Sequence, residues 1–117
     1  MDIKYIAGFF DGEGTCGVYI NGKQGSYNPK VSFYQNEKEV LEEIKNYFGI
    51  GKIFSGGSRG KGSVLSVQNR RHCSVILQEM LPFLRVKYKD ALKVIEWCEN
   101  TPYKREGGDY FGVVRTA

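Results

Sequence analysis

Two acidic residues close a predicted N-terminal helix, where their carboxylates could bind a divalent cation. They are Asp11 and Glu13, within the segment IAGFFDGEG at residues 6–14. An acid is unfavourable at a helix C-terminus, and a bound cation would offset that cost. Carboxylate, carbonyl and water oxygens are the ligands that suit Mg²⁺. The pattern therefore favours a metal site over the alternative, a helix-end turn with solvent-exposed acids.

Two glycines in the same segment lie four positions apart, and so on one face of the helix. Glycine inside a helix costs about 1 kcal/mol relative to alanine, so Gly8 and Gly12 require a reason. One such reason is the close approach of a second helix backbone. Ala7, which neighbours Gly8, is small as well. If two copies of the chain cross at these glycines, the acids of both copies converge. The alternatives are tight packing within one domain and, for Gly12, a helix C-cap.

Residue periodicity predicts the elements that must position this segment. The predicted helices span about residues 3–12, 37–47, 71–80 and 89–100, and the predicted strands span about 15–21, 30–35, 52–55 and 64–69. Asp2 and Asn36 are expected to cap the first two helices, and glycines to end them. No linker interrupts the chain, which predicts a single domain over residues 1–117, with a core of about 1–100 and a tail of 101–117.

The predicted strands alternate apolar and polar residues, as half-buried strands do. In the second strand, Val31 and Phe33 face one way, and the residues between and beside them, Lys30, Ser32 and Tyr34, face the other. The pattern predicts an α+β fold in which four antiparallel strands lay their apolar face on the helices. The opposite face is then polar, basic and free of carboxylates, and its two-stranded hairpins could enter the DNA major groove.

Charge is segregated along the chain, which has a formal net charge of +4 and a pI near 9.0. Residues 15–36 and 44–69 contain no Asp or Glu, whereas four glutamates gather in residues 37–43. Such segregation indicates a cationic face for a polyanionic partner, and an ordinary solvated mixture of charges is the alternative.

Composition argues against several other classes of protein. No run of 18 apolar residues is present for a membrane span, and the N-terminus lacks the layout of a signal peptide. Cys16, Cys73 and Cys98 are scattered without a CxxC pair, which indicates neither a disulfide framework nor a zinc site. We therefore expect a reducing intracellular compartment, either the cytoplasm or an organelle.

Residues 6–14 resemble the LAGLIDADG motif at all nine positions, with Glu13 at the second acidic position and Gly12 in place of a small alanine. The order of predicted elements is also similar to the αββαββα core of that family. With its single motif, the chain resembles the homodimeric class of LAGLIDADG homing endonucleases. The resemblance implies a four-stranded, saddle-shaped DNA-binding sheet and site-specific double-strand cleavage of a long, pseudo-palindromic DNA target. It also implies Mg²⁺ or Mn²⁺ as cofactor, whereas Ca²⁺ would bind without supporting cleavage.

The resemblance assigns roles to individual residues. Glu13 corresponds to the metal-binding acid, and the carbonyl of Gly12 to a neighbouring ligand. Gln35 would lie near the nucleophilic water and Lys87 beside the scissile phosphate, with Lys38 in the same solvent network. The dimer interface would comprise Ala7, Gly8, Asp11 and Gly12. The DNA-binding residues would be Tyr19, Asn21, Lys23, Gln24, Tyr27, Asn28, Lys30, Ser32, Tyr34, Lys38, Phe54, Arg59, Lys61, Ser66 and Gln68.

No protein nucleophile is expected, since the implied mechanism is metal-assisted hydrolysis of a phosphodiester. His72, the only histidine, is interpreted as structural or phosphate-contacting. Two other functions stay open. One is a non-cleaving nucleic-acid-binding relative, such as an intron RNA maturase or a transcriptional regulator, and the other is a small structural or ligand-binding dimer. Retention of an acid at Glu13 favours cleavage over binding alone.

Overall fold

Helices and strands follow one another along the chain in the predicted order. The computed structural model describes residues 1–20, 26–55 and 62–100. Its elements are α1 (Ile3–Glu13), β1 (Gly14–Ile20), β2 (Tyr27–Gln35), α2 (Lys38–Phe48), β3 (Lys52–Ser55), β4 (Ser63–Val67), α3 (Arg70–Met80), the short 3₁₀ helix η1 (Leu81–Phe83) and α4 (Tyr88–Asn100). Each predicted element is present with bounds shifted by at most three residues, and η1 was not predicted.

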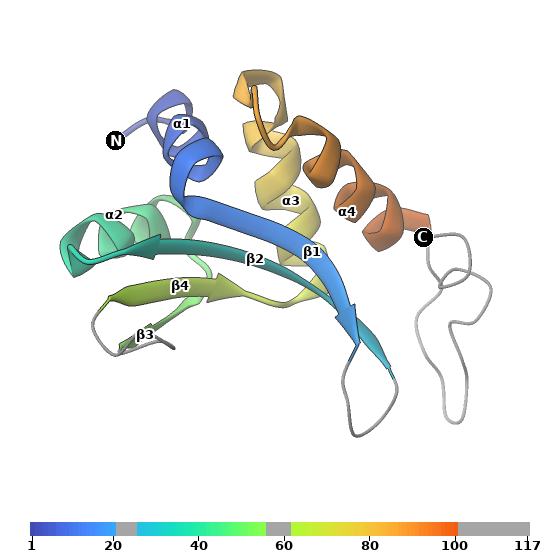
Figure 1. The fold of residues 1–117 in the computed structure, drawn as a ribbon, viewed down its shortest axis with the longest axis horizontal. Helices are drawn as coiled ribbons and strands as arrows, with labels where there is room; N and C mark the ends of the chain where they lie inside the picture. The colour runs from blue at the N-terminus through green and yellow to red at the C-terminus, as the bar shows by residue number, and fades with distance from the viewer. Residues whose placement is uncertain (21–25, 56–61, 101–117) are drawn as a thin grey trace.

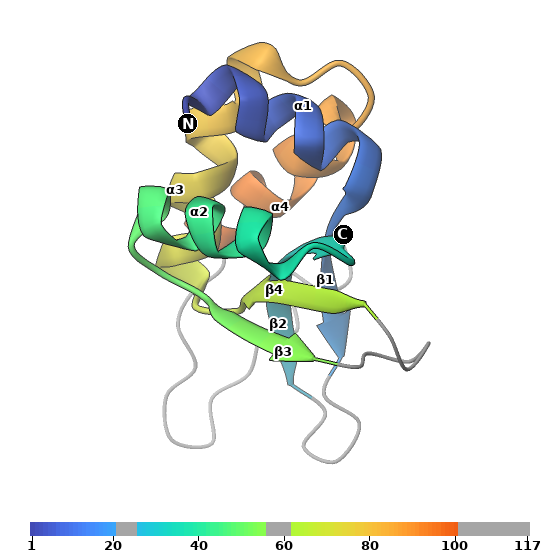
Figure 2. The same ribbon diagram turned by 90° about the vertical axis from the view of Figure 1, so that its left-hand side faces the viewer.

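The four strands form one antiparallel sheet in the order β1-β2-β4-β3. All the α-helices lie on one face of this sheet, and none of the described residues forms a helix on the other face (Figure 1). The same two-layer arrangement is seen from the side in Figure 2. This is the α+β fold that the alternation of apolar and polar residues predicts. None of the described helices is long and apolar enough to cross a membrane.

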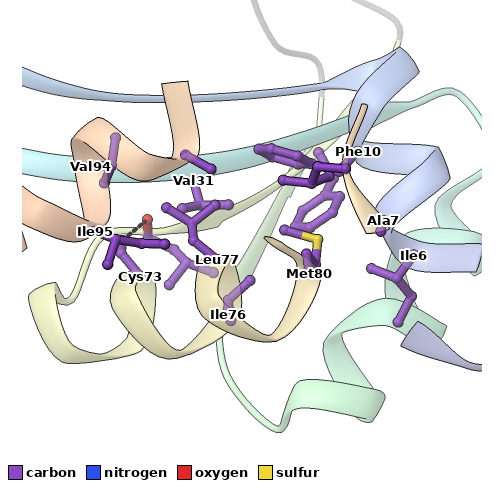
Figure 3. Close-up of a cluster of buried hydrophobic side chains, with 14 of the residues drawn as sticks. Ile6, Ala7, Phe10, Val31, Cys73, Ile76, Leu77, Met80, Val94 and Ile95 are labelled. Carbon is purple, nitrogen blue, oxygen red and sulfur yellow. Dashed lines mark hydrogen bonds between the residues drawn. The ribbon is translucent and has the colours of Figure 1, made fainter. Parts of the chain in front are cut away.

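The core lies between the helices and the inner face of the sheet. Figure 3 shows Phe10 of α1, Val31 of β2, Leu77 of α3 and Val94 of α4 pointing into one cluster, and each of the four is at most 2% exposed. Phe10 packs edge-on against Phe33, with 5.2 Å between the ring centroids. Burying a side chain of this size stabilises the fold by about 1.5–3 kcal/mol. The core therefore fixes which face of α1 is turned inward.

The ends of α1 and α2 are held in different ways. Asp2 caps α1 as predicted, since its Oδ1 accepts a hydrogen bond of 2.9 Å from the backbone N–H of Tyr5. The predicted cap of α2 by Asn36 is wrong, because the N-cap is Glu37 and no side chain caps the helix. The side-chain oxygen of Gln35 accepts instead from the N–H groups of Asn36 (2.8 Å) and Glu37 (3.3 Å) just before the helix. The helix consequently begins at residue 38, one residue later than predicted.

Strand β2 begins three residues before its predicted start, and this changes which side chains face the helices. Pro29 lies within the strand although proline cannot donate to a sheet ladder. It is accommodated because β2 pairs with β1 alone in this stretch, and the pairing with β4 starts only at Val31. Tyr27 pairs with Ile20 and packs against the core on the helix side, and Ile20 itself is 57% exposed instead of buried.

Candidate active site

The C-terminal end of α1 carries the motif acid Glu13, the last residue of the helix. Its side chain is exposed and forms no hydrogen bond or ion pair with any residue of the described chain. Gly14 follows it as the C-cap, with its N–H donating to the carbonyl of Phe10, and a Cβ at Gly14 would collide with the Phe10 ring. Close packing of the chain on Phe10 therefore fixes the direction in which α1 passes into β1.

The glycine face of α1 is bare in the single subunit. Gly8 and Gly12 are exposed, and no atom of the described chain comes within 4 Å of a Cβ placed on either residue. Neither glycine is therefore needed for packing within the subunit, and the helix C-cap is Gly14 and not Gly12. Tyr5, one turn before Gly8 on the helix, is 52% exposed. An apolar, small-residue helix face is thus available for another surface.

Ala7 does not belong to that face, contrary to its predicted place in a dimer interface. It is fully buried beside Ile6 and Phe10 in the core of its own subunit. The reason is the helical rotation of about 100° per residue, which turns Ala7 to the core side while Gly8 faces out. The small-residue surface therefore consists of Gly8 and Gly12.

Asp11 is bound within its own subunit. Its carboxylate accepts hydrogen bonds from three consecutive backbone N–H groups, those of Arg85 (2.8 Å), Val86 (3.1 Å) and Lys87 (3.0 Å). Partial burial works to raise the pKa of Asp11, but these three donors and the nearby Lys87 ammonium together hold that pKa below its usual value. Of the two motif acids, Glu13 is the one whose oxygens are available for a cation.

Lys87 is brought to the same helix end from the loop between η1 and α4. Its Nζ donates a hydrogen bond of 2.7 Å to the backbone carbonyl of Asp11. This carbonyl is one of the last in α1, which lack partners within the helix. The ammonium therefore lies at the last turn of α1, which carries Gly12 and Glu13. The interaction of Asp11 with this loop is a feature that sequence reasoning missed.

Gln35 reaches this region from the end of β2. It lies two residues beyond Phe33, which pairs with Gly14, the residue after Glu13. Its side-chain oxygen is occupied by the two backbone N–H groups described above, which leaves the amide NH₂ as the available donor. Lys38 is exposed in the first turn of α2, three residues further on.

The end of α1 offers two oxygen groups that could be ligands of a divalent cation. Glu13 offers an unbonded carboxylate, and the Gly12 carbonyl is another of the unpartnered C-terminal carbonyls of α1. Across residues 1–20, 26–55 and 62–100, no group of three His, Cys, Asp or Glu side chains is close enough together to hold an ion. Oxygen ligands of this type suit Mg²⁺ and Mn²⁺.

The sheet face opposite the helices carries most of the described residues that were predicted to bind DNA. Tyr19, Asn28, Lys30, Ser32, Tyr34, Phe54 and Ser66 alternate with the core residues in the strand register and therefore lie on this outer face. Tyr27 does not, because it packs on the helix side. Ser32 is on the outer face but only 1% exposed, since it is small and lies between Thr15 and Ser66 on the neighbouring strands. Asn21, Lys23, Gln24, Arg59 and Lys61 are outside the described residues.

The outer face is basic as well as polar. None of β1–β4 contains an acid, and the Lys30 ammonium lies 5.6 Å from the centre of the Tyr19 ring. Lys52, which sequence reasoning missed, shares this face because it stands two positions before Phe54 in β3. A hollow at one end of the sheet is lined by Lys52, Phe54, Gln68 and His72. Strand alternation could have identified Lys52.

Comparison with known proteins identifies the family to which this fold and helix end belong. The family model described as LAGLIDADG endonuclease matches residues 6–98. The chain is therefore a member of the LAGLIDADG endonuclease family. This confirms the resemblance on which the predicted fold and residue roles were based.

Individual relatives are similar over most of this chain. DNA endonuclease I-CreI of Chlamydomonas reinhardtii is 28% identical in an alignment that covers 93% of this chain and 69% of the relative. The archaeal intron-encoded homing endonuclease I-Vdi141I, solved in complex with DNA, has a TM-score of 0.73 and 28% identity over 83% of this chain and 66% of its own. The homing endonuclease I-CvuI has a TM-score of 0.75 and 20% identity over 83% of this chain and 65% of its own. The chain thus spans about two thirds of the length of these relatives.

Proposed function

We propose that the chain is a homing endonuclease that acts as a homodimer and makes a double-strand cut in a long, pseudo-palindromic DNA target with divalent metal ions. One observation carries the proposal. The Glu13 carboxylate is unbonded at the end of α1, the Lys87 ammonium is held to the Asp11 carbonyl near the same helix end, and the exposed face of this helix is bare at Gly8 and Gly12. The similarity to I-CreI, a DNA endonuclease, and to I-Vdi141I, solved with DNA, supports it.

The dimer follows from the glycine face of α1. Backbone surfaces that carry no Cβ allow two helices to approach closely. A second copy of α1 that crosses the first at Gly8 and Gly12 would bring the two Glu13 carboxylates near each other. Such a pair is related by two-fold symmetry, so the two halves of the DNA target would be related in the same way.

DNA would lie along the outer face of the sheet. This face has no acids in its strands and presents Lys30, Lys52 and hydrogen-bonding side chains such as Asn28. Lysines would bind phosphates, while the amide of Asn28 could read base edges in the major groove. Symmetry places two such faces side by side in the dimer, which favours a long target.

Each site residue has a distinct task in the proposed reaction. When bound, Mg²⁺ or Mn²⁺ would polarise the scissile phosphate and lower the pKa of the attacking water. Glu13 and the Gly12 carbonyl would hold the ions, and the second subunit, water and DNA would supply the remaining ligands. The Lys87 ammonium offsets negative charge that develops on the phosphate. The amide NH₂ of Gln35 can orient water, and no side chain acts as a nucleophile.

Selection of cleaved sites from a random duplex library tests this proposal. The dimer is incubated with the library and Mg²⁺, the broken ends are sequenced, and a matched reaction contains a chelator. We expect double-strand ends at one family of long sites with two-fold symmetry, and none with the chelator. Specific binding without ends would support a non-cleaving relative. Absence of duplex binding even at low ionic strength would contradict any role with DNA.

A further inference from the structure

We propose that Asp11 is a positioning residue, which acts by fixing the 85–87 loop so that the Lys87 ammonium is held at the end of α1. The inference deepens the proposed function and rests on it. It differs from a role in metal binding or in the dimer contact, since it assigns the carboxylate of the first motif acid to its own subunit.

The geometry consists of four hydrogen bonds between one residue and one short loop. Asp11 Oδ2 accepts from the N–H of Arg85, and Oδ1 accepts from those of Val86 and Lys87. The backbone carbonyl of Asp11 accepts from Lys87 Nζ. Consecutive N–H groups that converge in this way form a concave site for an anion. Here the anion is a carboxylate of the same chain.

Lys87 is held to Asp11 at both of its ends. Its N–H donates to the Asp11 side chain and its ammonium donates to the Asp11 backbone. The long, flexible lysine side chain is therefore fixed at both ends by hydrogen bonds to one residue. An ammonium that is fixed before the substrate binds loses less conformational entropy when it contacts a phosphate.

The loop has few other contacts that could fix it. Val86 is 74% exposed and Arg85 is exposed, so neither side chain packs into the core. Leu84, only 7% exposed, anchors the start of the segment, and α4 begins at residue 88. Between these points, the N–H groups of residues 85–87 all donate to the Asp11 carboxylate, and the Lys87 carbonyl accepts from the N–H of Ala91 in the first turn of α4. Loss of this carboxylate should release the loop without unfolding the core.

The test combines a structural measurement with a double-mutant cycle. Asp11→Asn replaces one acceptor oxygen by an NH₂ group, which cannot accept hydrogen bonds from the N–H groups of the loop. In this variant, we expect the amide protons of residues 85–87 to exchange with solvent at least about tenfold faster, measured by NMR. Unchanged exchange of these amides would overturn the positioning role alone. Glu96→Gln, which removes one exposed carboxylate from α4, is the charge-matched control.

The cycle measures single-turnover cleavage of bound DNA by Asp11→Asn, Lys87→Met and the double variant. We expect about a tenfold slower rate for Asp11→Asn and a larger loss for Lys87→Met. The double variant should be no slower than Lys87→Met, because Asp11 acts only through Lys87. Losses that multiply would overturn the proposal. Absence of cleavage by the wild-type protein would overturn the proposed function and, with it, the role of Asp11 in the reaction.

Discussion

The Nζ of Lys87 lies 2.7 Å from the backbone carbonyl oxygen of Asp11, although the two residues are 76 positions apart in the chain. The contact joins the loop before α4 to the end of α1, the helix whose last residue is the exposed Glu13. A cation and an unbonded carboxylate at one helix end are the parts that a metal-dependent phosphodiesterase requires. The exposed glycine face of the same helix suggests that a second subunit packs there and supplies a second ammonium and a second carboxylate.

Gly8→Leu should separate the dimer while leaving the subunit folded. Leucine favours a helix by about 0.8–1 kcal/mol over glycine, and no atom of the described part of the same subunit lies within 4 Å of a Cβ at this position. Between two crossing helices, overpacking by about 1–3 kcal/mol from each copy would weaken dimerisation by roughly 30-fold or more. Sedimentation measures the dimer, and circular dichroism measures helix content.

Asn46→Leu is the matched control, since it adds a leucine to an exposed position of α2. It should dimerise as the wild type does. If Gly8→Leu sedimented as a normal dimer, the crossing of α1 helices at their glycines would be wrong.

Lys30→Gln and Lys52→Gln should each reduce the salt dependence of DNA binding. Each phosphate contact contributes about 0.9 to the slope of log K against log salt, so a substitution in both subunits should lower the slope by about 1.8. Lys93→Gln, an exposed lysine of α4 on the helix side, should leave the slope unchanged. If all three variants had the same slope of log K against log salt, the DNA would not bind on the outer face of the sheet.

Phe33 and Phe54 should respond to truncation in opposite ways. Phe33 is fully buried, so Phe33→Ala should lower the free energy of unfolding by about 3–5 kcal/mol. Phe54 is 50% exposed on the outer face, and Phe54→Ala should cost less than about 1 kcal/mol while weakening DNA binding. Urea denaturation at one protein concentration gives the first quantity, and a binding titration gives the second. A similar loss of stability in both variants would contradict the assignment of the two sheet faces.

The three cysteines should resist alkylation in the folded protein. Burial raises the pKa of the Cys16 and Cys73 thiols to about 12, and that of Cys98 to about 11, from an ordinary value of 9.0. The reactive thiolate at pH 8 is therefore roughly 100- to 1000-fold scarcer than in the unfolded chain. Iodoacetamide labelling with and without urea, followed by mass spectrometry, measures this ratio. Equal labelling rates in both states would contradict the burial of these residues.

The sequence was sufficient to predict the features that follow from local periodicity. The spacing of Ile6 and Phe10 identifies the core face of α1, and the interval between Gly8 and Gly12 identifies the opposite face. Asp2 caps the helix through a contact with a residue only three positions away. Each of these relationships lies within one or two helical turns, so each leaves a pattern in neighbouring residues.

Features that depend on distant segments could not be predicted in this way. The bonds between Asp11 and residues 85–87 join parts of the chain that only the tertiary fold brings together. Ser32 is buried because of its neighbours on two other strands, although its own strand pattern places it on the outer face. At the start of α2, Gln35 was not expected to take part, yet its side-chain oxygen accepts from the N–H groups of Asn36 and Glu37, and the helix begins one residue later than predicted.

The most direct test of the account is single-turnover cleavage of a bound DNA target in Mg²⁺ by Glu13→Gln. Glu42→Gln, at an exposed position of α2, serves as the control. We predict that Glu13→Gln keeps the dimer and its DNA affinity but cleaves at least about 100-fold more slowly, because the ion loses its carboxylate ligand. Cleavage by Glu13→Gln at the wild-type rate would contradict the proposed metal site at the end of α1.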